Sequence, residues 1–299
     1  MRAAVIGLGS MGFGMATSLA RAGLDVSGFD TREETLARFT AGRAARSIRE
    51  AVEDADVVVI VVVNADQTEA VLFAQDGIVA SARPGTVVLS CATMAPDRAR
   101  SFAARVTAAG LHYVDAPISG GATRAAQGEL TILASGTPAA IERAGPALEA
   151  MSAKTYFLGD EAGIGASFKM VNQLLAGVHI AAACEAIVFA SKLGLDLAKV
   201  HEVITASAGN SWMFENRIPH VLDGDYAPRS AVEIFTKDLG IVSDMSRSAN
   251  LATPVAASAL QMFLMTASMG MAKDDDASVA RLYAMLAQTD LPAAGRKPE

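Results

Sequence analysis

A glycine pattern near the N-terminus limits the folds open to this chain. It follows an expected strand at residues 2–6 and precedes an expected helix at residues 13–22, and it consists of Gly7, Leu8, Gly9, Ser10, Met11 and Gly12. In G-x-G-x-x-G the first glycine allows a tight turn, the second lets a pyrophosphate approach the backbone, and the third lets helix and strand pack closely. The helix N-terminus adds N–H donors and partial positive charge. The pattern predicts a dinucleotide-binding βαβ unit, with a glycine-rich turn that binds nothing as the alternative.

An acidic residue supports the dinucleotide interpretation. The next expected strand, residues 25–29, leads into Asp30, 18 residues after Gly12. A carboxylate at this position accepts hydrogen bonds from the adenosine ribose hydroxyls and repels the 2′-phosphate of NADP. Asp30 therefore predicts NAD as the cofactor, while the nearby Arg32 keeps NADP open.

The rest of the chain divides into two halves of different pattern. Further strands are expected at residues 56–62, 86–89, 112–115, 130–134 and 155–158, with a helix at 138–151. The run VVVIVVV at 57–63 lacks polar alternation, as a strand covered on both faces does. From residue 163 on the strand signal ends and four or five helical segments follow. We predict an α/β fold: a doubly wound Rossmann-type domain at 1–162, an all-helical domain at 163–299, and a frayed tail after Pro292.

Composition excludes several classes of protein. The net charge is −7, and no cluster of Lys and Arg is present to bind nucleic acid. Two cysteines and four histidines show neither a disulfide framework nor metal-ligand spacing, which predicts a cytoplasmic protein without a metal. The glycines near the N-terminus interrupt what would otherwise resemble a signal peptide. The apolar stretch 174–190 carries His179 and Glu185, so we expect a buried helix and no membrane partner.

A second glycine-containing segment is a candidate anion site. Ser119, Gly120 and Gly121 follow the expected strand at 112–115 and open the next expected helix. Amides and a hydroxyl at a helix start can converge on a carboxylate, which predicts a substrate-binding cradle. An ordinary N-cap formed by Ser119 is the alternative.

Two lysines are candidates for acid–base chemistry. Lys169 and Asn172 are three residues apart and share a helix face. A lysine that loses its charge on burial can transfer protons, and the amide can orient it, although a surface lysine would show the same spacing. Lys237 lies among apolar residues, and its charge near Lys169 would favour the neutral base.

Two residues after strands are candidate cofactor contacts. Asn64 follows the valine-rich strand, and Thr93 follows the strand at 86–89. Ligands of open parallel sheets bind at the carboxyl ends of the strands, which predicts contacts with the dinucleotide. For Thr93 the alternative is to cap the helix that starts at Pro96.

Four segments resemble the β-hydroxyacid dehydrogenase family in order along the chain: GLGSMGFGMA at 7–16, DAPISGGATRAAQGEL at 115–130, GIGASFKMVNQ at 163–173 and KDLGIV at 237–242. The resemblance implies an NAD-dependent dehydrogenase of small hydroxy acids whose helical domain forms a homodimer or homotetramer. It also implies Lys169 as general acid/base, Asn172 as its helper, Ser119, Gly120 and Gly121 as the carboxylate site, and Lys237 beside substrate and cofactor. Many relatives carry a second asparagine where this chain has Gln173, which alters the support of Asn172.

Within the family, residues 173–197 and 208–242 are similar to the members that act on L-threonate. Asn210 and Ser211 suit a polyhydroxylated acid, because buried hydroxyls need polar partners. Residues 210–217 are candidate substrate contacts in their own subunit or a neighbouring one, with Trp212 alternatively a packing anchor. The alternative substrates are 3-hydroxyisobutyrate, tartronate semialdehyde and 4-hydroxybutyrate or succinate semialdehyde. A non-catalytic dinucleotide-binding protein is the alternative of another class.

Overall fold

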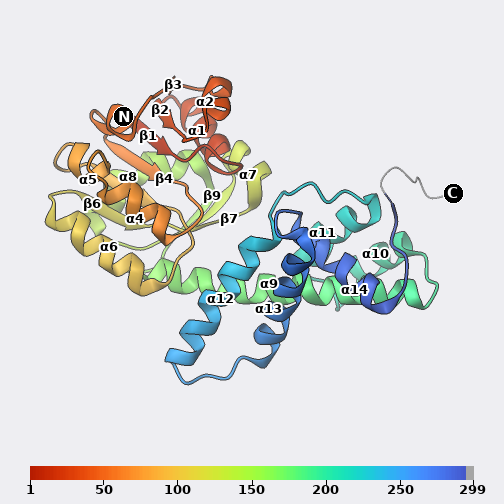
Figure 1. The fold of residues 1–299 in the computed structure, drawn as a ribbon. Helices are drawn as coiled ribbons and strands as arrows, with labels where there is room; N and C mark the ends of the chain where they lie inside the picture. The colour runs from red at the N-terminus through yellow and green to blue at the C-terminus, as the bar shows by residue number, and fades with distance from the viewer. Residues whose placement is uncertain (294–299) are drawn as a thin grey trace. The chain divides into compact units, whose positions relative to one another are not determined.

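The computed structural model describes residues 1–293. The chain divides into two compact units, Met1–Lys169 and the helical part from Met170 on (Figure 1). The tail predicted to fray after Pro292 lies, from residue 294 on, outside the described residues. Each unit is described by itself below.

A parallel sheet forms the centre of the first unit. Its strands are ordered β3-β2-β1-β4-β5-β6, the doubly wound order in which ligands bind outside the carboxyl ends of the strands. Ile6 pairs with Phe29 on one side and with Ile60 on the other, so β1, β2 and β4 end at the same edge. The strands are β1 (Arg2–Ile6), β2 (Asp25–Phe29), β3 (Arg43–Ala44), β4 (Val57–Ile60), β5 (Val87–Ser90) and β6 (His112–Asp115).

Helices cover both faces of this sheet. Alternate residues of β1 enter opposite clusters: Ala3 and Val5 belong to one core, and Ala4 and Ile6 to the other, because strand side chains alternate in direction. The helices between the strands are α1 (Gly12–Arg21), α2 (Glu33–Arg38), α3 (Ile48–Val52), α4 (Ala65–Phe73), α5 (Ile78–Ser81) and α6 (Pro96–Ala108). The predicted α/β class is confirmed.

A second, mixed sheet completes this unit. Strand β7 (Ile118–Ser119) is antiparallel to β8 (Leu130–Ala134), which is parallel to β9 (Ser152–Phe157), and the connecting helices are α7 (Gly121–Gln127) and α8 (Pro138–Met151). The sequence predicts β8 and α8 with these bounds but misses β3 and β7, since two-residue strands show no alternation. The strand expected at 56–62 is shorter, because after Ile60 the chain leaves the ladder toward the glycine loop.

The second unit is helical. It contains most of α9 (Ile164–Lys192), followed by α10 (Leu197–Thr205), α11 (Trp212–Asp223), α12 (Val232–Ser248), α13 (Pro254–Thr266), the π-helical η1 (Ala267–Met271), the 3₁₀ turn η2 (Asp276–Ser278) and α14 (Val279–Ala287). By length and hydropathy alone, α9 and the segment Pro254–Met271 could each cross a membrane. Half of the most apolar 18-residue stretch of α9, however, is buried inside the protein. The rings of Phe235 and Phe263 stack with their centroids 5.1 Å apart, in the same hydrophobic core as the buried residues of α9.

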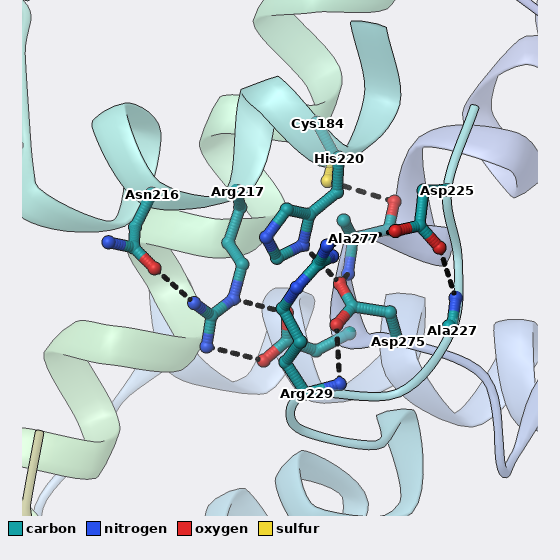
Figure 2. A network of polar contacts seen from close by, with 10 residues as sticks. Cys184, Asn216, Arg217, His220, Asp225, Ala227, Arg229, Asp275 and Ala277 are labelled. Atoms are coloured by element: carbon teal, nitrogen blue, oxygen red, sulfur yellow. Dashed lines mark hydrogen bonds and ion pairs between the residues drawn. The ribbon is translucent and has the colours of Figure 1, made fainter. Parts of the chain in front are cut away.

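A buried polar network ties α11 to η2 (Figure 2). Arg217 Nε and Nη2 donate to the two oxygens of Asp276 at 2.6 and 3.1 Å. Next to this pair, His220 Nδ1 lies 2.9 Å from Asp275 Oδ1, and Asp275 Oδ2 accepts the backbone N–H of Arg229 at 3.0 Å. Burial raises the pKa of Asp276 above its ordinary value, against the lowering effect of Arg217. For Asp275, burial is outweighed by hydrogen bonds from His220 and the Arg229 amide, and its pKa is lowered.

We expect replacement of Asp276 by alanine to destabilise the helical unit strongly. The substitution leaves the Arg217 guanidinium buried without its partner, a change that costs about 3 kcal/mol of unfolding free energy. The control Glu202→Ala removes the exposed Lys199–Glu202 pair and should cost less than about 1 kcal/mol. Urea unfolding followed by circular dichroism measures both, and equal effects of the two substitutions would show that the buried pair contributes no more than an exposed one.

Candidate functional site

The glycine loop satisfies two requirements of the fold itself. Gly7 has φ +94° and donates its N–H to Phe29 O at 2.8 Å. A Cβ added to Gly7 would lie 2.4 Å from Val61 O, and one added to Gly12 would lie 1.9 Å from Gly7 O. Both positions therefore exclude any side chain, whatever the loop binds.

Gly9 has a different environment. The nearest atom to a Cβ added there is Arg32 Nη2, at 3.8 Å, so the described chain leaves this side of the loop open. The N-cap of α1, Met11, makes no side-chain hydrogen bond to the helix start. A cavity of about 510 Å³ adjoins Gly9, lined by Leu8, Gly9, Ser10, Phe13, Gly14, Thr17, Arg32, Thr35, Arg38, Ala122 and Ala126. Open space above a helix N-terminus fits the pyrophosphate of a dinucleotide.

Asp30 lies at the end of β2 and borders this loop. Its carboxylate accepts the Leu8 N–H at 2.8 Å, the Arg32 N–H at 2.9 Å and Arg32 Nε at 3.1 Å. Burial raises the pKa of Asp30, but the hydrogen bonds from the Arg32 side chain and from the two amides outweigh it and hold the pKa below its ordinary value. The residue is thus a fixed anion beside the loop, and the Arg32 charge is paired with it, an arrangement that fits unphosphorylated ribose.

The other predicted cofactor contacts follow neighbouring strands. Asn64 comes after β4 and its Oδ1 accepts the Gln67 N–H at 2.9 Å, which caps α4. Thr93 comes after β5, and the N-cap of α6 is Ala95, so Thr93 is not itself the N-cap residue of this helix. Because β1, β4 and β5 are parallel neighbours, both residues follow the same sheet edge as the glycine loop. Their contact with the dinucleotide stays a prediction.

The predicted carboxylate cradle lies beside Lys169. Ser119 is in β7, and α7 begins after Gly120, which is the N-cap, so the N-cap alternative for Ser119 is wrong. Gly120 and Gly121 have φ +138° and +79°, and a Cβ on Gly121 would meet nothing within 4 Å. Lys169 is 6% exposed, and its Nζ donates to Ile118 O at 2.8 Å. The structure thereby joins the predicted base to the strand that leads into the cradle.

Two residues that were not predicted as site residues hold the start of α9. Asp115 Oδ2 accepts the N–H groups of Gly163 at 2.9 Å and Ala166 at 2.8 Å, and Ser135 Oγ accepts that of Gly165 at 2.9 Å. Burial raises the pKa of Asp115 to about 6, although the two amides lower it. The sequence signal for this contact is weak, since Asp115 is 48 residues from Gly163.

In the helical unit a chain of polar side chains joins Asn172 to Lys237. Asn172 Nδ2 donates to Gln173 Oε1 at 2.9 Å, and Gln173 Nε2 donates to Asp238 Oδ2 at 2.5 Å. Lys237 Nζ lies 2.6 Å from Asp238 Oδ1. Gln173 thus supports the amide of Asn172, and its longer side chain also reaches the buried Asp238. Sequence reasoning missed Asp238, although it directly follows Lys237 in KDLGIV.

Residues 210–217 are largely engaged within the helical unit. Ser211 Oγ caps α11 by accepting the Phe214 N–H at 3.0 Å, and Asn210 Nδ2 donates to Glu215 Oε1 at 2.6 Å. Arg217 belongs to the buried network. Trp212 is 46% exposed, which argues against a role as a packing anchor. Substrate contact by this segment stays a prediction. Within residues 1–293, no cluster of three or more His, Cys, Asp or Glu side chains is able to hold a metal ion.

Comparisons with known proteins cover both units. Residues 2–159 match the family model described as the NAD binding domain of 6-phosphogluconate dehydrogenase. Residues 163–283 match the model described as the NAD-binding domain of NADP-dependent 3-hydroxyisobutyrate dehydrogenase.

Individual relatives align over almost the whole chain. The L-threonate dehydrogenase of Cupriavidus necator is 49% identical over 281 residues, 93% of this chain and 95% of the relative. That of Haemophilus influenzae is 46% identical, covering 94% of each protein. The crystal structure of a 3-hydroxyisobutyrate dehydrogenase from Salmonella typhimurium superposes with a TM-score of 0.90 at 46% identity, over 94% of this chain and 99% of that one.

The loop geometry predicts opposite effects for two glycine-to-alanine substitutions. Gly9→Ala places a methyl group where the described chain is open, so we expect an unchanged thermal midpoint and at least about tenfold weaker NAD binding. Gly12→Ala drives a methyl into Gly7 O and should lower the thermal midpoint by several degrees. Calorimetric titration with NAD and thermal unfolding measure these effects. Normal NAD affinity in Gly9→Ala would show that the pyrophosphate does not lie over this loop.

Proposed function

This chain belongs to the 3-hydroxyisobutyrate dehydrogenase-like family of NAD-dependent hydroxy-acid dehydrogenases, and from that premise we propose that it oxidises L-threonate at C2 to 2-dehydro-L-erythronate (2-oxo-tetronate). L-threonate dehydrogenases that are 44% to 49% identical over at least 93% of the chain support this substrate. We also propose a cytoplasmic location, in keeping with the two buried free cysteines.

The observation that carries the proposal is the position of Lys169. Oxidation of a secondary alcohol requires a base for the hydroxyl proton, and a buried lysine in its neutral form is suited to that task. Lys169 is buried, and its Nζ contacts the backbone of β7 one residue before the cradle of Ser119, Gly120 and Gly121. In our proposal the cradle holds the substrate carboxylate, so that the neighbouring C2 hydroxyl faces Nζ.

The residues around the glycine loop fit NAD. Amides of the loop and of α1 would hold the pyrophosphate, and Asp30 would accept hydrogen bonds from the adenosine ribose. When bound, NAD supplies the hydride acceptor for the C2 hydrogen. The chain itself contributes the orientation of the substrate and the acceptance of the hydroxyl proton by Lys169 Nζ.

In the helical unit, Asn172 has the role of orienting the substrate. Its amide is held by Gln173, which is fixed in turn by Asp238. An amide that is restrained in this way loses little conformational freedom when it binds a hydroxyl group. Lys237, held by Asp238, would contribute positive charge to the binding of the anionic substrate and cofactor.

A second candidate substrate is 3-hydroxyisobutyrate. The Salmonella typhimurium structure with a TM-score of 0.90 carries that name at 46% identity. A substrate panel separates these possibilities. The panel consists of L-threonate, 3-hydroxyisobutyrate, 4-hydroxybutyrate and glycerate (the reduced form of tartronate semialdehyde), and formation of NADH from NAD, or of NADPH from NADP, is measured with each acid. NAD binding without turnover of any of these acids would favour a non-catalytic dinucleotide-binding protein.

We expect Lys169→Ala to abolish most turnover while NAD binding survives. Loss of the general base should lower kcat by about 10²- to 10⁴-fold. The wild-type rate of oxidation should rise with pH, because a lysine must lose its proton before it accepts another. Steady-state NADH formation and calorimetric NAD binding test these expectations. Undiminished turnover in Lys169→Ala would exclude the lysine as the base.

The outer face of α9 supports assembly of the helical domain as a homodimer or homotetramer. Val171, Leu175 and Phe189 are 64%, 49% and 65% exposed on this helix. Leu175, Ala182 and Phe189 recur at intervals of seven residues, the repeat of helices that pack along one another. We propose that a second copy of the chain covers this stripe.

The double substitution Leu175→Glu and Phe189→Glu should convert the oligomer into smaller species. Burying two carboxylates in an apolar interface is strongly unfavourable. Lys192→Glu, at the exposed end of the same helix, is the control and should keep the wild-type mass. Sedimentation velocity measures all three proteins. A wild-type monomer, or an unchanged mass in the double variant, would contradict assembly through α9.

A further inference from the structure

We propose that Asp115 is a positioning residue for the reaction: its ionised carboxylate holds the first turn of α9 and thereby fixes the amine of Lys169. The inference rests on the proposed function in one respect, the role of Lys169 as general acid/base. Asp115 itself would touch neither substrate nor cofactor.

The geometry connects Asp115 to Lys169 in two ways. Asp115 Oδ2 accepts the N–H groups of Gly163 and Ala166, and Lys169 follows Ala166 by three residues on the same helix. The segment that carries Asp115 also carries Ile118, whose carbonyl accepts Lys169 Nζ at 2.8 Å. One short segment, 115–118, therefore holds both the backbone at the start of the helix and the side chain of its lysine.

The packing leaves little freedom in this arrangement. A Cβ added to Gly165 would lie 2.2 Å from Leu133 O, so the first turn of α9 is pressed against β8. Ser135 Oγ accepts the Gly165 N–H at 2.9 Å and lies 3.5 Å from Asp115 Oδ2. The strand end, the serine and the helix start thus form one rigid contact.

A neutral hydrogen-bond acceptor at position 115 could bind the same backbone N–H groups without the free-energy penalty of burying a charge. Asp115 is fully buried, and among the described residues its Oδ1 has no hydrogen-bond partner. A buried charge is unfavourable for folding, whereas hydrogen bonds to a carboxylate are about twice as strong as those to a neutral oxygen. The chain therefore tolerates a buried anion where it secures the turn that carries Lys169.

Of Asp115, Cys91 and Tyr113, which lie close together, only Asp115 changes its charge near pH 6. Burial raises the pKa of Asp115 to about 6, against the hydrogen bonds to its carboxylate and the weaker effect of the Arg100 guanidinium on α6, which lower it. Burial raises the pKa of the Cys91 thiol, after β5, to about 12, and it also raises the pKa of Tyr113 on β6. Thiol and phenol therefore remain protonated at the pH values at which Asp115 ionises.

Stability and positioning depend on pH with opposite sign at this residue. The folded pKa, about 6, lies above the ordinary value of 3.8, so the contribution of Asp115 to stability is lost as the pH rises through 6. The carboxylate that holds the amides of α9 most firmly forms over the same range. If Asp115 acts only in folding, its protonation should raise the stability of the protein and leave kcat unchanged. If Asp115 positions Lys169, its protonation should lower kcat.

The test is the isosteric variant Asp115→Asn, compared with wild type. We expect at least tenfold lower kcat with L-threonate and NAD at pH 8, an unchanged KM for NAD, and a thermal midpoint no lower than that of wild type. The ratio of wild-type kcat to variant kcat should fall toward one as the pH drops below 6, because the protonated Asp115 of the wild type then resembles the asparagine. Wild-type kcat in the variant at pH 8 would overturn the proposal, as would a kcat loss matched by a lower thermal midpoint at both pH 5 and pH 8.

A second pair of variants covers a failure of Asp115→Asn to fold. Ser135→Ala removes the contacts of Ser135 Oγ with the Gly165 N–H and with Asp115 Oδ2, and it should lower kcat severalfold. Thr86→Val removes another buried hydroxyl, bonded to Ala55 O at 2.9 Å before β5, and should leave kcat unchanged. Equal kcat in these two variants would overturn the proposal.

One readout separates this proposal from the proposed function. In Asp115→Asn, the amides of residues 163–166 should exchange with deuterium faster than in wild type, and acetic anhydride should acetylate Lys169 faster at pH 8. If Asp115→Asn does not fold, the same two measurements are made on Ser135→Ala. Unchanged exchange and acetylation would exclude the positioning role even if no hydroxy acid is a substrate. Inactive wild-type protein with the expected changes would contradict the substrate alone.

Discussion

The start of α9 is a junction on which both the fold and the candidate site depend. Three backbone N–H groups that a helix start leaves without intrahelical partners are bound by Asp115 and Ser135. These acceptors come from β6 and from the end of β8, so the helix begins where the two sheets meet. The same helix continues into the core of the helical unit, where Ile180 and Cys184 are fully buried.

The glycine loop shows how one motif serves two purposes. Gly7 and Gly12 approach backbone oxygens so closely that the fold alone requires them. Gly9 meets no such obstacle, and its missing side chain is explained by a ligand that approaches the open side of the loop. The distinction turns a sequence pattern into a physical argument for dinucleotide binding, and Asp30, held by Leu8 and Arg32, adds a fixed anion at the same edge.

Much of the fold follows from local patterns. The bounds of β1, β2, β6, β8 and α8 agree with the sequence-based expectations, because hydrophobic runs and turn residues mark their ends. The strands β3 and β7 escape prediction, since two residues carry no periodicity. Among site residues, the sequence identifies Lys169 and Asn172 by their helical spacing. It misses Asp115 and Asp238, whose partners are 48 and 65 residues away in the chain.

By itself the sequence determined the doubly wound first half, the helical second half and the residue types available for NAD and a hydroxy acid. These features depend on short-range spacing, which hydrophobic periodicity and glycine placement record directly. Only the tertiary structure decided which polar groups support them: Ile118 O for Lys169, and Gln173 with Asp238 for Asn172. Such partners are chosen by the packing of distant segments, because a buried donor or acceptor must be satisfied by whatever group the fold brings within reach.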